Sequence, residues 1–296
     1  MLNRDEVEQF RQVAYFSQFW RELKRDPIAL VSIYLFSMLL VLVLLGRGLA
    51  PYAAESQFIG KELLPPFWHA LGQFSHFLGT DDLGRDIFSR ILYGFHYTAG
   101  AALAITFVIA FLGGLIGILA ALKKGSSFTL LNHLFDTFLF TPILLIAIII
   151  ATLMEPSLVN AVLAVFLAML PHFSHKIYQA TQQELAKDYV IMLRLEGVTH
   201  WQLVVEVILP NLIIVALKEL SYIFSIAVLD ISALSFIGLG AQSPMPEWGA
   251  MIRDSMELIY LSPWAVILSG VAIILVIFIV TLFGNSMVRV LEKYRY

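Results

Sequence analysis

The sequence contains no cysteine, and charged residues make up only 14% of its 296 positions. Without cysteine, neither disulfide bonds nor thiolate metal sites contribute to the fold, and the redox compartment is left undetermined. Hydrophobic residues make up 59% of the chain and the mean hydropathy is +0.82, far above that of an ordinary soluble domain. This composition predicts a protein that crosses a membrane several times. The net charge of -3 carries little information, because the placement of Lys and Arg is what matters in such a protein.

Sequence motifs of nucleotide binding and of hydrolytic catalysis are also missing. No G-x-x-x-x-G-K-[ST] phosphate loop occurs, since Gly60-Lys61 lacks the earlier glycine and the following hydroxyl. Neither a G-x-S-x-G elbow nor an H-E-x-x-H helix is present. His172 and His175 could share a metal ion, but no carboxylate or third histidine lies nearby in sequence, which favours interfacial histidines. We therefore expect no catalysis, no metal and no cofactor in this chain.

Apolar segments recur at lengths that suit membrane helices. A helix rises about 1.5 Å per residue, so about 20 apolar residues cross a hydrocarbon core of about 30 Å. The first run, residues 28–45, is too long and lies too far into the chain for a typical cleaved signal peptide. The predicted fold class is an all-α membrane protein with six transmembrane helices, at residues 28–49, 97–122, 137–154, 157–175, 212–238 and 264–283.

Glycines and prolines inside these segments carry further expectations. Gly113 and Gly117 have the spacing that lets membrane helices approach closely, which indicates a helix-packing role. Pro142 lies inside the third predicted span and is expected to kink it, because membrane helices tolerate proline. The fourth predicted span ends with Pro171 and the two histidines.

The segments outside the spans differ in character. Residues 1–27 place aromatic and basic residues at roughly helical spacing, which suits a cytoplasmic amphipathic helix on the membrane surface, with a solvated tail as the alternative. Residues 50–96 are expected to form a periplasmic linker and then an elbow helix, because the first part is proline-rich and has no regular period. Residues 97–285 would form the core, and residues 286–296 a short basic tail in the cytoplasm.

Residues 79–94, GTDDLGRDIFSRILYG, predict an amphipathic elbow helix that leads into the second span. Thr80 is a candidate N-cap, and the aspartates of the first turn suit the positive end of the helix dipole. Gly94 is expected to end this helix.

Charged residues in the same stretch have the spacing of helical ion pairs, Asp81 with Arg85 and Asp86 with Arg90. The aspartates lack the alternating ligands and the glycine of a calcium loop, so capping and pairing are favoured over a metal site. The elbow motif consists of Gly79, Thr80, Asp81, Gly84, Arg85 and Asp86.

A partly polar stretch at residues 186–211 lies between two spans and predicts a compact docking knob of two short helices. The first helix has a small or apolar flank that consists of Ala186, Tyr189, Val190, Leu193 and Gly197. A separate soluble protein could grip such a knob.

The two helices of this docking knob have recognisable boundaries. Gly197 can adopt the left-handed conformation that ends a helix, and Thr199 with Gln202 forms a plausible capping box. The second helix is expected to run from Trp201 to Leu209 and to be closed by Pro210. A DNA-binding helix-turn-helix is the rival interpretation, but residues 200–209 contain neither Lys nor Arg, so no nucleic-acid partner is expected.

Two acidic residues interrupt the fifth predicted span. Glu219 and Asp230 are eleven residues apart, close to three helical turns, so they share one face of the helix. A carboxylate inside a membrane helix is costly unless it faces water or a partner. Both residues are therefore candidates for lining a polar pathway, and an Asp230 that is hydrogen-bonded to neighbouring helices is an equally weighted alternative.

The distribution of basic residues predicts the orientation. The side that carries the two termini and the docking knob is the more basic, with Arg4, Arg11, Arg21, Lys24, Arg25, Lys123, Lys124, Lys176, Lys187, Arg194, Arg289, Lys293 and Arg295. The opposite side has only Arg47, Lys61, Arg85, Arg90 and Arg253. Because cytoplasmic loops of membrane proteins are enriched in Lys and Arg, both termini and the knob are expected to face the cytoplasm.

Three stretches together resemble the inner-membrane permease subunits of bacterial peptide and nickel ABC importers. They are GTDDLGRDIFSR at 79–90, Gly197 followed by Val207-Ile208-Leu209-Pro210, and LSFIGLGAQSPMPEWGAM at 234–251. The resemblance implies a six-helix permease of the MetI-like fold in the bacterial inner membrane, surrounded by lipid. It also implies a homologous second permease, two cytoplasmic ATPases that bind the ATP, and a periplasmic solute-binding protein.

The family's coupling signature is Glu-Ala-Ala, three residues, Gly, nine residues and Ile-x-Leu-Pro. Gly197, Leu209 and Pro210 match it and Val207 is conservative, whereas residues 191–193 are Ile-Met-Leu in place of Glu-Ala-Ala. After the elbow, His96 stands where the family commonly has Arg. The replacement at residues 191–193 leaves the expected fold of the knob intact and bears on the polar contacts that the knob would offer to an ATPase.

The function that this resemblance implies is a permease powered by separate ATPases that moves peptides, with one branch of the family associated with cationic antimicrobial peptides and polyamines. ATP-driven closure of the ATPases would move the knob around Gly197 as a rigid body. The alternatives are a gradient-driven secondary transporter that uses Asp230 as a proton relay, and a membrane enzyme that uses His172 or His175. The sequence leaves the solute and the direction of transport open.

Overall fold

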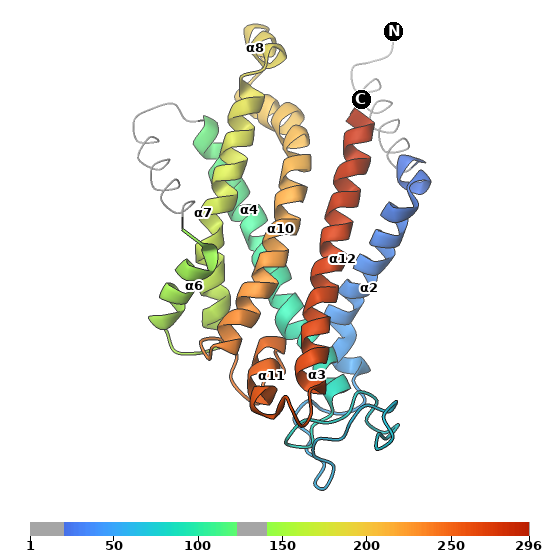
Figure 1. Ribbon diagram of the computed structural model, residues 1–296. Coiled ribbons are helices and arrows are strands. Elements are labelled where there is room, and N and C mark those ends of the chain that lie inside the picture. The colour runs from blue at the N-terminus through green and yellow to red at the C-terminus, as the bar shows by residue number, and fades with distance from the viewer. Residues whose placement is uncertain (1–20, 123–140, 296) are drawn as a thin grey trace.

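The computed structural model describes residues 21–122 and 141–295, apart from the side chains of His200, Tyr294 and Arg295. Five helices in these ranges are long and apolar enough to cross a membrane (Figure 1). They are Pro27–Leu49 (α2), Ile87–Leu122, Leu158–Leu185 (α7), Leu203–Phe236 and Trp264–Lys293 within α12. The helical membrane fold is thus confirmed, and the expectations for residues 1–20 and 123–140 lie outside the described residues.

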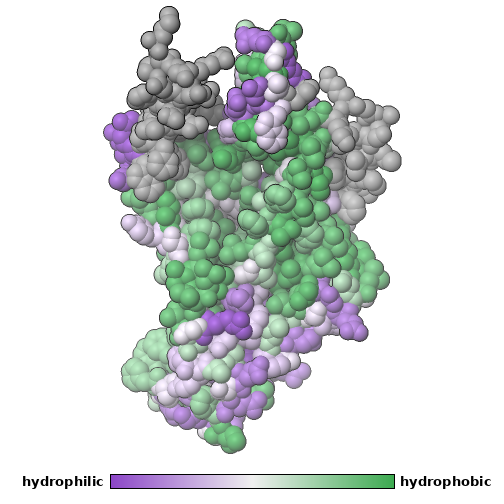
Figure 2. All heavy atoms as spheres, turned by 180° about the vertical axis from the view of Figure 1, so that it is seen from behind, coloured by the Kyte–Doolittle hydropathy of each residue, from purple (hydrophilic) through white to green (hydrophobic). Residues whose placement is uncertain are grey.

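The surface of the bundle fits a lipid bilayer. A hydrophobic belt separates two more polar ends of the molecule (Figure 2). Leu44, Phe107 and Ile274 lie on different long helices, and 75%, 76% and 66% of their surfaces are exposed. Large apolar side chains are left open in this way when lipid, and not water, surrounds them.

The third predicted span is described only in its second part. Helix α6 (Ile143–Thr152) begins directly after Pro142, which is its N-cap residue. Proline is well suited to the start of a helix because its missing N–H has no partner to lose there. Within the described residues Pro142 therefore marks a helix start, and the predicted kink inside a helix is not seen.

The fourth predicted span is longer than expected. Helix α7 continues through Pro171 to Leu185, so the prediction that the span ends near His175 was wrong. Because membrane helices tolerate an internal proline, Pro171 does not end this one. Lys176, which the sequence analysis placed outside the membrane, consequently lies within the helix.

Helix α7 packs closely against α4 (Gly100–Leu122) at the two predicted glycines. A Cβ atom on Gly113 would lie 2.8 Å from the Phe173 Cδ1 atom, and one on Gly117 would lie 2.6 Å from the Ser174 carbonyl oxygen. No larger side chain fits at either position, which confirms the packing role of these glycines.

The two ends of the bundle carry different elements. Helix α8 (Asp188–Leu195), the start of α2 and the end of α12 (Trp264–Arg295) lie at one end (Figure 1). The linker of residues 50–86, α3 (Ile87–Gly94) and α11 (Trp248–Ser255), which is followed by the short 3-10 helix Met256–Leu258, lie at the other. Helix α12 extends beyond Phe283, the predicted end of its span, and pairs with α2 through the stacked rings of Phe36 and Phe283 at 4.2 Å.

Candidate functional site

In the docking knob, residues 186–211, helix α8 projects from the end of the bundle beyond α7 (Figure 1). Helix α8 ends at Leu195, and Gly197 adopts φ = +86°, the left-handed conformation expected of a glycine that follows a helix. The Thr199 hydroxyl accepts the Gln202 backbone N–H at 3.3 Å, while the Gln202 side chain accepts the Thr199 N–H at 3.2 Å. The predicted break and capping box are therefore both present.

The predicted end of the second knob helix is wrong. A helical turn at His200–Gln202 (α9) leads into a π-helical segment at Leu203–Ile208 (η2), which continues without interruption into α10 (Leu209–Phe236). Pro210 lies inside this continuous helix and does not close it, because membrane helices tolerate an internal proline. The knob is thereby continuous with the fifth membrane helix.

The base of the knob is held by a glutamate on α7 that the sequence analysis missed. Glu184 is 6% exposed, and it accepts hydrogen bonds from Lys187 Nζ at 2.6 Å, from the Tyr189 hydroxyl, and from Asn211 Nδ2 at 2.9 Å. Asn211 also donates to the Val207 carbonyl at 2.8 Å. Glu184 thus ties the two ends of the knob together. Glu184 precedes the polar stretch in sequence, so the stretch itself did not point to it. The signal that could have found it is that Glu184 and Asn211 flank the two ends of the stretch and can form a hydrogen bond.

The knob buries one set of apolar residues and exposes another. Val190, Leu203 and Ile208 are at most 1% exposed and belong to the core of the bundle. The exposed surface is also strongly apolar, with exposed fractions of 47% at Ile191, 61% at Met192, 83% at Leu195, 75% at Trp201 and 43% at Leu209. An apolar surface of this kind on a projecting segment is typical of a site that another protein covers.

The elbow motif has a different structure from the one predicted. Residues 79–86 form a turn with left-handed Gly79 and Gly84, and α3 starts only at Ile87. Asp86 is the N-cap, because its carboxylate accepts the Ser89 backbone N–H at 2.8 Å. Thr80 instead accepts the Leu64 N–H at 2.9 Å and donates to the Lys61 carbonyl, so it anchors the linker.

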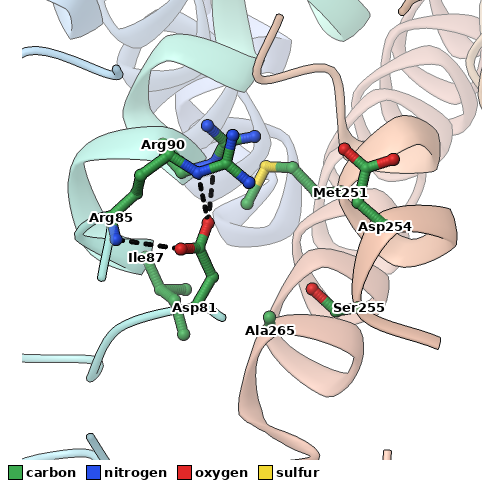
Figure 3. A pocket seen from close by; sticks show the side chains of 8 residues that line it. All are labelled: Asp81, Arg85, Ile87, Arg90, Met251, Asp254, Ser255 and Ala265. Carbon is green, nitrogen blue, oxygen red and sulfur yellow. Dashed lines mark hydrogen bonds and ion pairs between the residues drawn. The ribbon is translucent and has the colours of Figure 1, made fainter. Parts of the chain in front are cut away.

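The charged residues of this motif pair in an unexpected way (Figure 3). Asp81 does pair with Arg85 at 2.7 Å, but within the turn and not along a helix. The predicted pair of Asp86 with Arg90 is absent from the ion pairs of the described residues. Arg90 lies 3.7 Å from Asp81, and Asp86 contacts the buried His76 at 3.1 Å. Burial raises the pKa of the neighbouring Asp82 carboxyl, and the charge of Asp81 adds to this effect.

Gly94 does not end the elbow helix. A π-helical segment at Phe95–Ala99 (η1) carries the chain directly into α4. Gly94 is needed for a different reason, because a Cβ atom there would lie 2.0 Å from the Trp248 Nε1 atom. The Trp248 indole is fully buried, and its N–H donates to the Ile91 carbonyl at 3.3 Å.

Glu247, the residue before Trp248, connects three elements at this corner. It is fully buried and accepts hydrogen bonds from the Thr98 and Ser232 hydroxyls, each at 3.0 Å, and from the Ala250 N–H at 2.9 Å. It therefore joins the η1 segment, α10 and α11. Together, residues 79–99 and 247–255 form a densely bonded unit that we call the α3–α11 corner.

The structure places the two predicted pathway carboxylates at different depths on α10. Glu219 is half-buried, and its carboxylate lies within electrostatic reach of the Lys176 and Lys218 amines. Asp230 is only 5% exposed, and its Oδ2 atom has no hydrogen-bond partner among the described residues. A buried polar atom without a protein partner requires water, a proton or a solute to satisfy it.

The two histidines of α7 lie in a polar stretch of that helix. No group of three or more potential ligands of the His, Cys, Asp or Glu type occurs in the part of the chain that the structure describes. The His175 ring nitrogen Nε2 lies 2.6 Å from the Gln179 side-chain amide on the same helix. This contact favours a structural or polar role over metal binding.

Known proteins resemble this chain over nearly its whole length. The family described as binding-protein-dependent transport system inner membrane component matches residues 113–294, and the N-terminal transmembrane domain of oligopeptide transport permease C matches residues 14–66. The peptide transport system permease protein SapC of Haemophilus influenzae is 50% identical over 294 residues, which cover 99% of this chain and 100% of that protein. SapC of Escherichia coli O6:H1 is 43% identical over 270 residues, which cover 91% of each chain.

More distant matches include another permease and a solved structure. The dipeptide transport system permease protein DppC of Escherichia coli K12 is 32% identical over 270 residues, covering 91% of this chain and 90% of that protein. A chain of the inward-facing methionine ABC transporter MetNI superposes with a TM-score of 0.52 at 15% identity, covering 66% of this chain and 94% of that one. At this identity the structural match supports the fold alone.

Proposed function

The chain belongs to the family of binding-protein-dependent transport system inner membrane components, the permeases of ABC transporters, and we propose that it moves peptides across the bacterial inner membrane. As a permease component of this family it is a multi-pass inner-membrane protein and not an enzyme. Peptides are supported as the solute because the SapC and DppC relatives are permeases of a peptide and a dipeptide transport system. Their match over at least 91% of this chain leaves no large segment without a counterpart in a peptide permease.

Permeases of this kind work in general with a partner permease, an ATPase and a substrate-binding protein. For this chain the proposed assembly has one homologous second permease, two cytoplasmic ATPases that bind all the ATP, and a periplasmic solute-binding protein. The exposed apolar surface of the docking knob is the observation that supports an ATPase partner most directly. The exposed residues Tyr189, Trp201, Leu209 and Pro210 would form that contact, and the buried Val190 and the bend at Gly197 would hold them in place.

We place the knob and both termini in the cytoplasm. The described basic residues at the knob end, such as Lys187, Arg194 and Lys293, are exposed. At the opposite end, Arg85 and Arg90 are buried and lie against Asp81, so their charges are partly neutralised. This difference adds to the excess of Lys and Arg at the knob end, and positive charge of that kind is retained in the cytoplasm.

Movement would pass from the ATPases to the membrane through two short connections. Glu184 ties α7 to both ends of the knob, and the knob continues directly into α10. A push on α8 would therefore act on both helices together, with Gly197 as the fixed bend between α8 and α9. Glu219 and Asp230, both on α10, are the proposed pathway residues, and this motion would expose them in turn to the two sides of the membrane.

The test of this function has two steps. First, the chain is purified from its native membrane in mild detergent and its stoichiometric companions are identified by mass spectrometry. A second six-span permease together with ATPases that contain phosphate loops is expected. Second, the purified complex is placed in liposomes and ATP-dependent movement of labelled peptides is measured. A chain that purifies alone and moves solute without ATP would refute the proposal and favour a gradient-driven carrier that uses Asp230.

A further inference from the structure

One face of α7 is polar although it lies at the depth of the membrane. His172, Lys176, Gln179 and Gln183 follow one another at i, i+4, i+7 and i+11, which places them on one side of the helix. His172 is half-buried, and the other three side chains are exposed. We call these four residues the α7 polar face. It points away from α4, because Phe173, Ser174 and Ile177 form the contact with the α4 glycines.

The contacts between α7 and α4 fix the depth of this face. Ser174 lies against Gly117, and two turns further on Gln182 Nε2 donates to the Ala121 carbonyl at 3.1 Å. Lys176 therefore lies between the levels of Gly117 and Ala121. At those levels α4 is apolar on its outside, with exposed fractions of 48% at Leu115, 40% at Ile116 and 49% at Leu119. An outside of this kind suits contact with lipid, and α7 presents a lysine at the same depth.

A second charged group, Glu219 on α10, lies near this face. The Glu219 carboxylate lies within electrostatic reach of Lys176 and of Lys218. Among the described residues, however, neither Lys176 nor Glu219 has a hydrogen bond or an ion pair. Two opposite charges thus stand close to each other without forming a direct pair. Charged groups inside a membrane protein face water or a partner and not lipid, because transfer into hydrocarbon is costly.

From this arrangement we infer that the α7 polar face and Glu219 line the knob-side half of a water-filled pathway and bind the ionised groups of a zwitterionic peptide. Lys176 pairs with a carboxylate of the solute and Glu219 pairs with an ammonium group. The inference rests on the proposed function, and it assigns to Lys176, Gln179 and Glu219 the recognition of the solute's charges. Charged hydrogen bonds of this kind are strong enough to discriminate between solutes.

The first experiment measures access of water to this face in the complete transporter. Because the chain has no cysteine, the variants Lys176→Cys, Gln179→Cys and Leu115→Cys each introduce a single thiol into this subunit. Each complex in liposomes is treated with a cationic, membrane-impermeant methanethiosulfonate reagent, and the mass of this chain is followed. Cysteines at 176 and 179 are expected to react at least about tenfold faster than the lipid-facing control at 115, since the thiolate that reacts forms in water. Equal rates would overturn the inference, because the face would then be covered by lipid, by the second permease or by residues 123–140.

The second experiment tests the recognition of charge. The complex with Lys176→Met is compared with the unchanged complex in transport of one peptide with a free C-terminal carboxylate and of the same peptide as an amide. The preference for the free carboxylate is expected to fall about tenfold in the variant, because one charge-assisted hydrogen bond is lost. An unchanged preference would contradict the role of Lys176. If the unchanged complex moves neither peptide, the proposed function itself fails, which is a distinguishable result.

Discussion

At the α3–α11 corner charged side chains are buried against one another, whereas at the opposite end of the bundle the docking knob holds its apolar side chains in the open. Asp81, Arg90 and Glu247 are at most 5% exposed, and each contacts at least two groups. Leu195 and Trp201 are 83% and 75% exposed. The usual placement of polar and apolar residues is thus reversed at both ends.

The difference indicates two mechanical roles. Buried charges are costly unless each one keeps its partner, so the corner holds α3, α10 and α11 in one arrangement. The knob rests on the bundle through Glu184 and a few buried apolar residues. Its exposed apolar surface contributes favourable free energy only when a partner covers it. In the proposed coupling motion, the corner would be the fixed end of the permease and the knob the end that is moved.

The largest predicted effect is the loss of a buried charge at the corner. Asp81→Asn leaves Arg90 without its carboxylate partner and Arg85 with only Asp82 at 4.0 Å, and we expect a loss of about 3 kcal/mol in the free energy of unfolding. Denaturation in detergent, followed by circular dichroism, measures this change. Glu22→Gln, which breaks the exposed pair with Arg25, serves as the control and should cost less than about 0.5 kcal/mol. Equal effects of the two variants would show that burial of the corner charges has no special importance.

Two tryptophans allow a direct comparison of the two regions. Trp248→Phe removes the indole N–H that donates to Ile91 and leaves unfilled space at a fully buried site, so a loss of about 2 kcal/mol is expected. Trp201→Phe on the knob should change stability by less than about 0.5 kcal/mol. Stability is read from the same denaturation curves. A destabilising effect at Trp201 as large as that at Trp248 would contradict the assignment of Trp201 to a free docking surface.

Gly197 provides a smaller effect that separates stability from coupling. Gly197→Ala places a side chain at φ = +86° with no neighbour within 4 Å of the new Cβ atom, so only the backbone cost of about 1 kcal/mol is expected. Gly270→Ala on α12 is matched, because it also has open space but an ordinary helical conformation, where alanine is favoured. In the assembled complex, Gly197→Ala should lower solute transport per ATP hydrolysed and Gly270→Ala should not. Unchanged coupling in both variants would remove Gly197 from the proposed motion.

The smallest effect concerns the pH dependence of the corner. Burial raises the pKa of Asp82, so the folded state binds a proton more tightly than the unfolded state does. The stability contributed by the Asp82 carboxyl is therefore complete at low pH. It is lost as the pH rises from the ordinary pKa of this carboxyl, 3.8, through its raised pKa in the folded state. Asp82→Asn should be slightly more stable than the unchanged protein at neutral pH, and equally stable at about pH 3. Denaturation at both pH values tests this prediction. A variant that is less stable than the unchanged protein at neutral pH would contradict a raised pKa of Asp82.

Features of the knob that depend on local backbone geometry could be predicted from the sequence. The left-handed Gly197 and the capping box of Thr199 with Gln202 involve residues at most a few positions apart. The Gly113 and Gly117 pair was recognisable for a similar reason, since its spacing alone defines a small face on a helix. Gly94 and Pro210 were misinterpreted as helix ends, because short π-helical segments next to them carry the chain onward.

The α3–α11 corner could not be predicted because its contacts join distant parts of the chain. Thr98 and Glu247 are 149 positions apart, and Ile91 and Trp248 are 157 apart. Helical ion-pair spacing suggested that Asp86 pairs with Arg90. In the folded chain, however, Asp86 contacts His76 and Arg90 lies close to Asp81. The family resemblance includes motifs from this region, but a sequence motif does not define which side chains contact each other.

The central claim is that the exposed knob is the contact with the ATPases, and site-specific crosslinking in native membranes tests it most directly. A photoreactive residue is introduced at Leu195 on the knob, and in a second variant at Tyr260, which is 98% exposed and follows the 3-10 helix Met256–Leu258 at the opposite end. After illumination, the partner attached to each site is identified by mass spectrometry. Our account predicts an ATPase with a phosphate loop at position 195 and no such partner at position 260. An ATPase attached at 260, or a position 195 that captures only lipid, would contradict it.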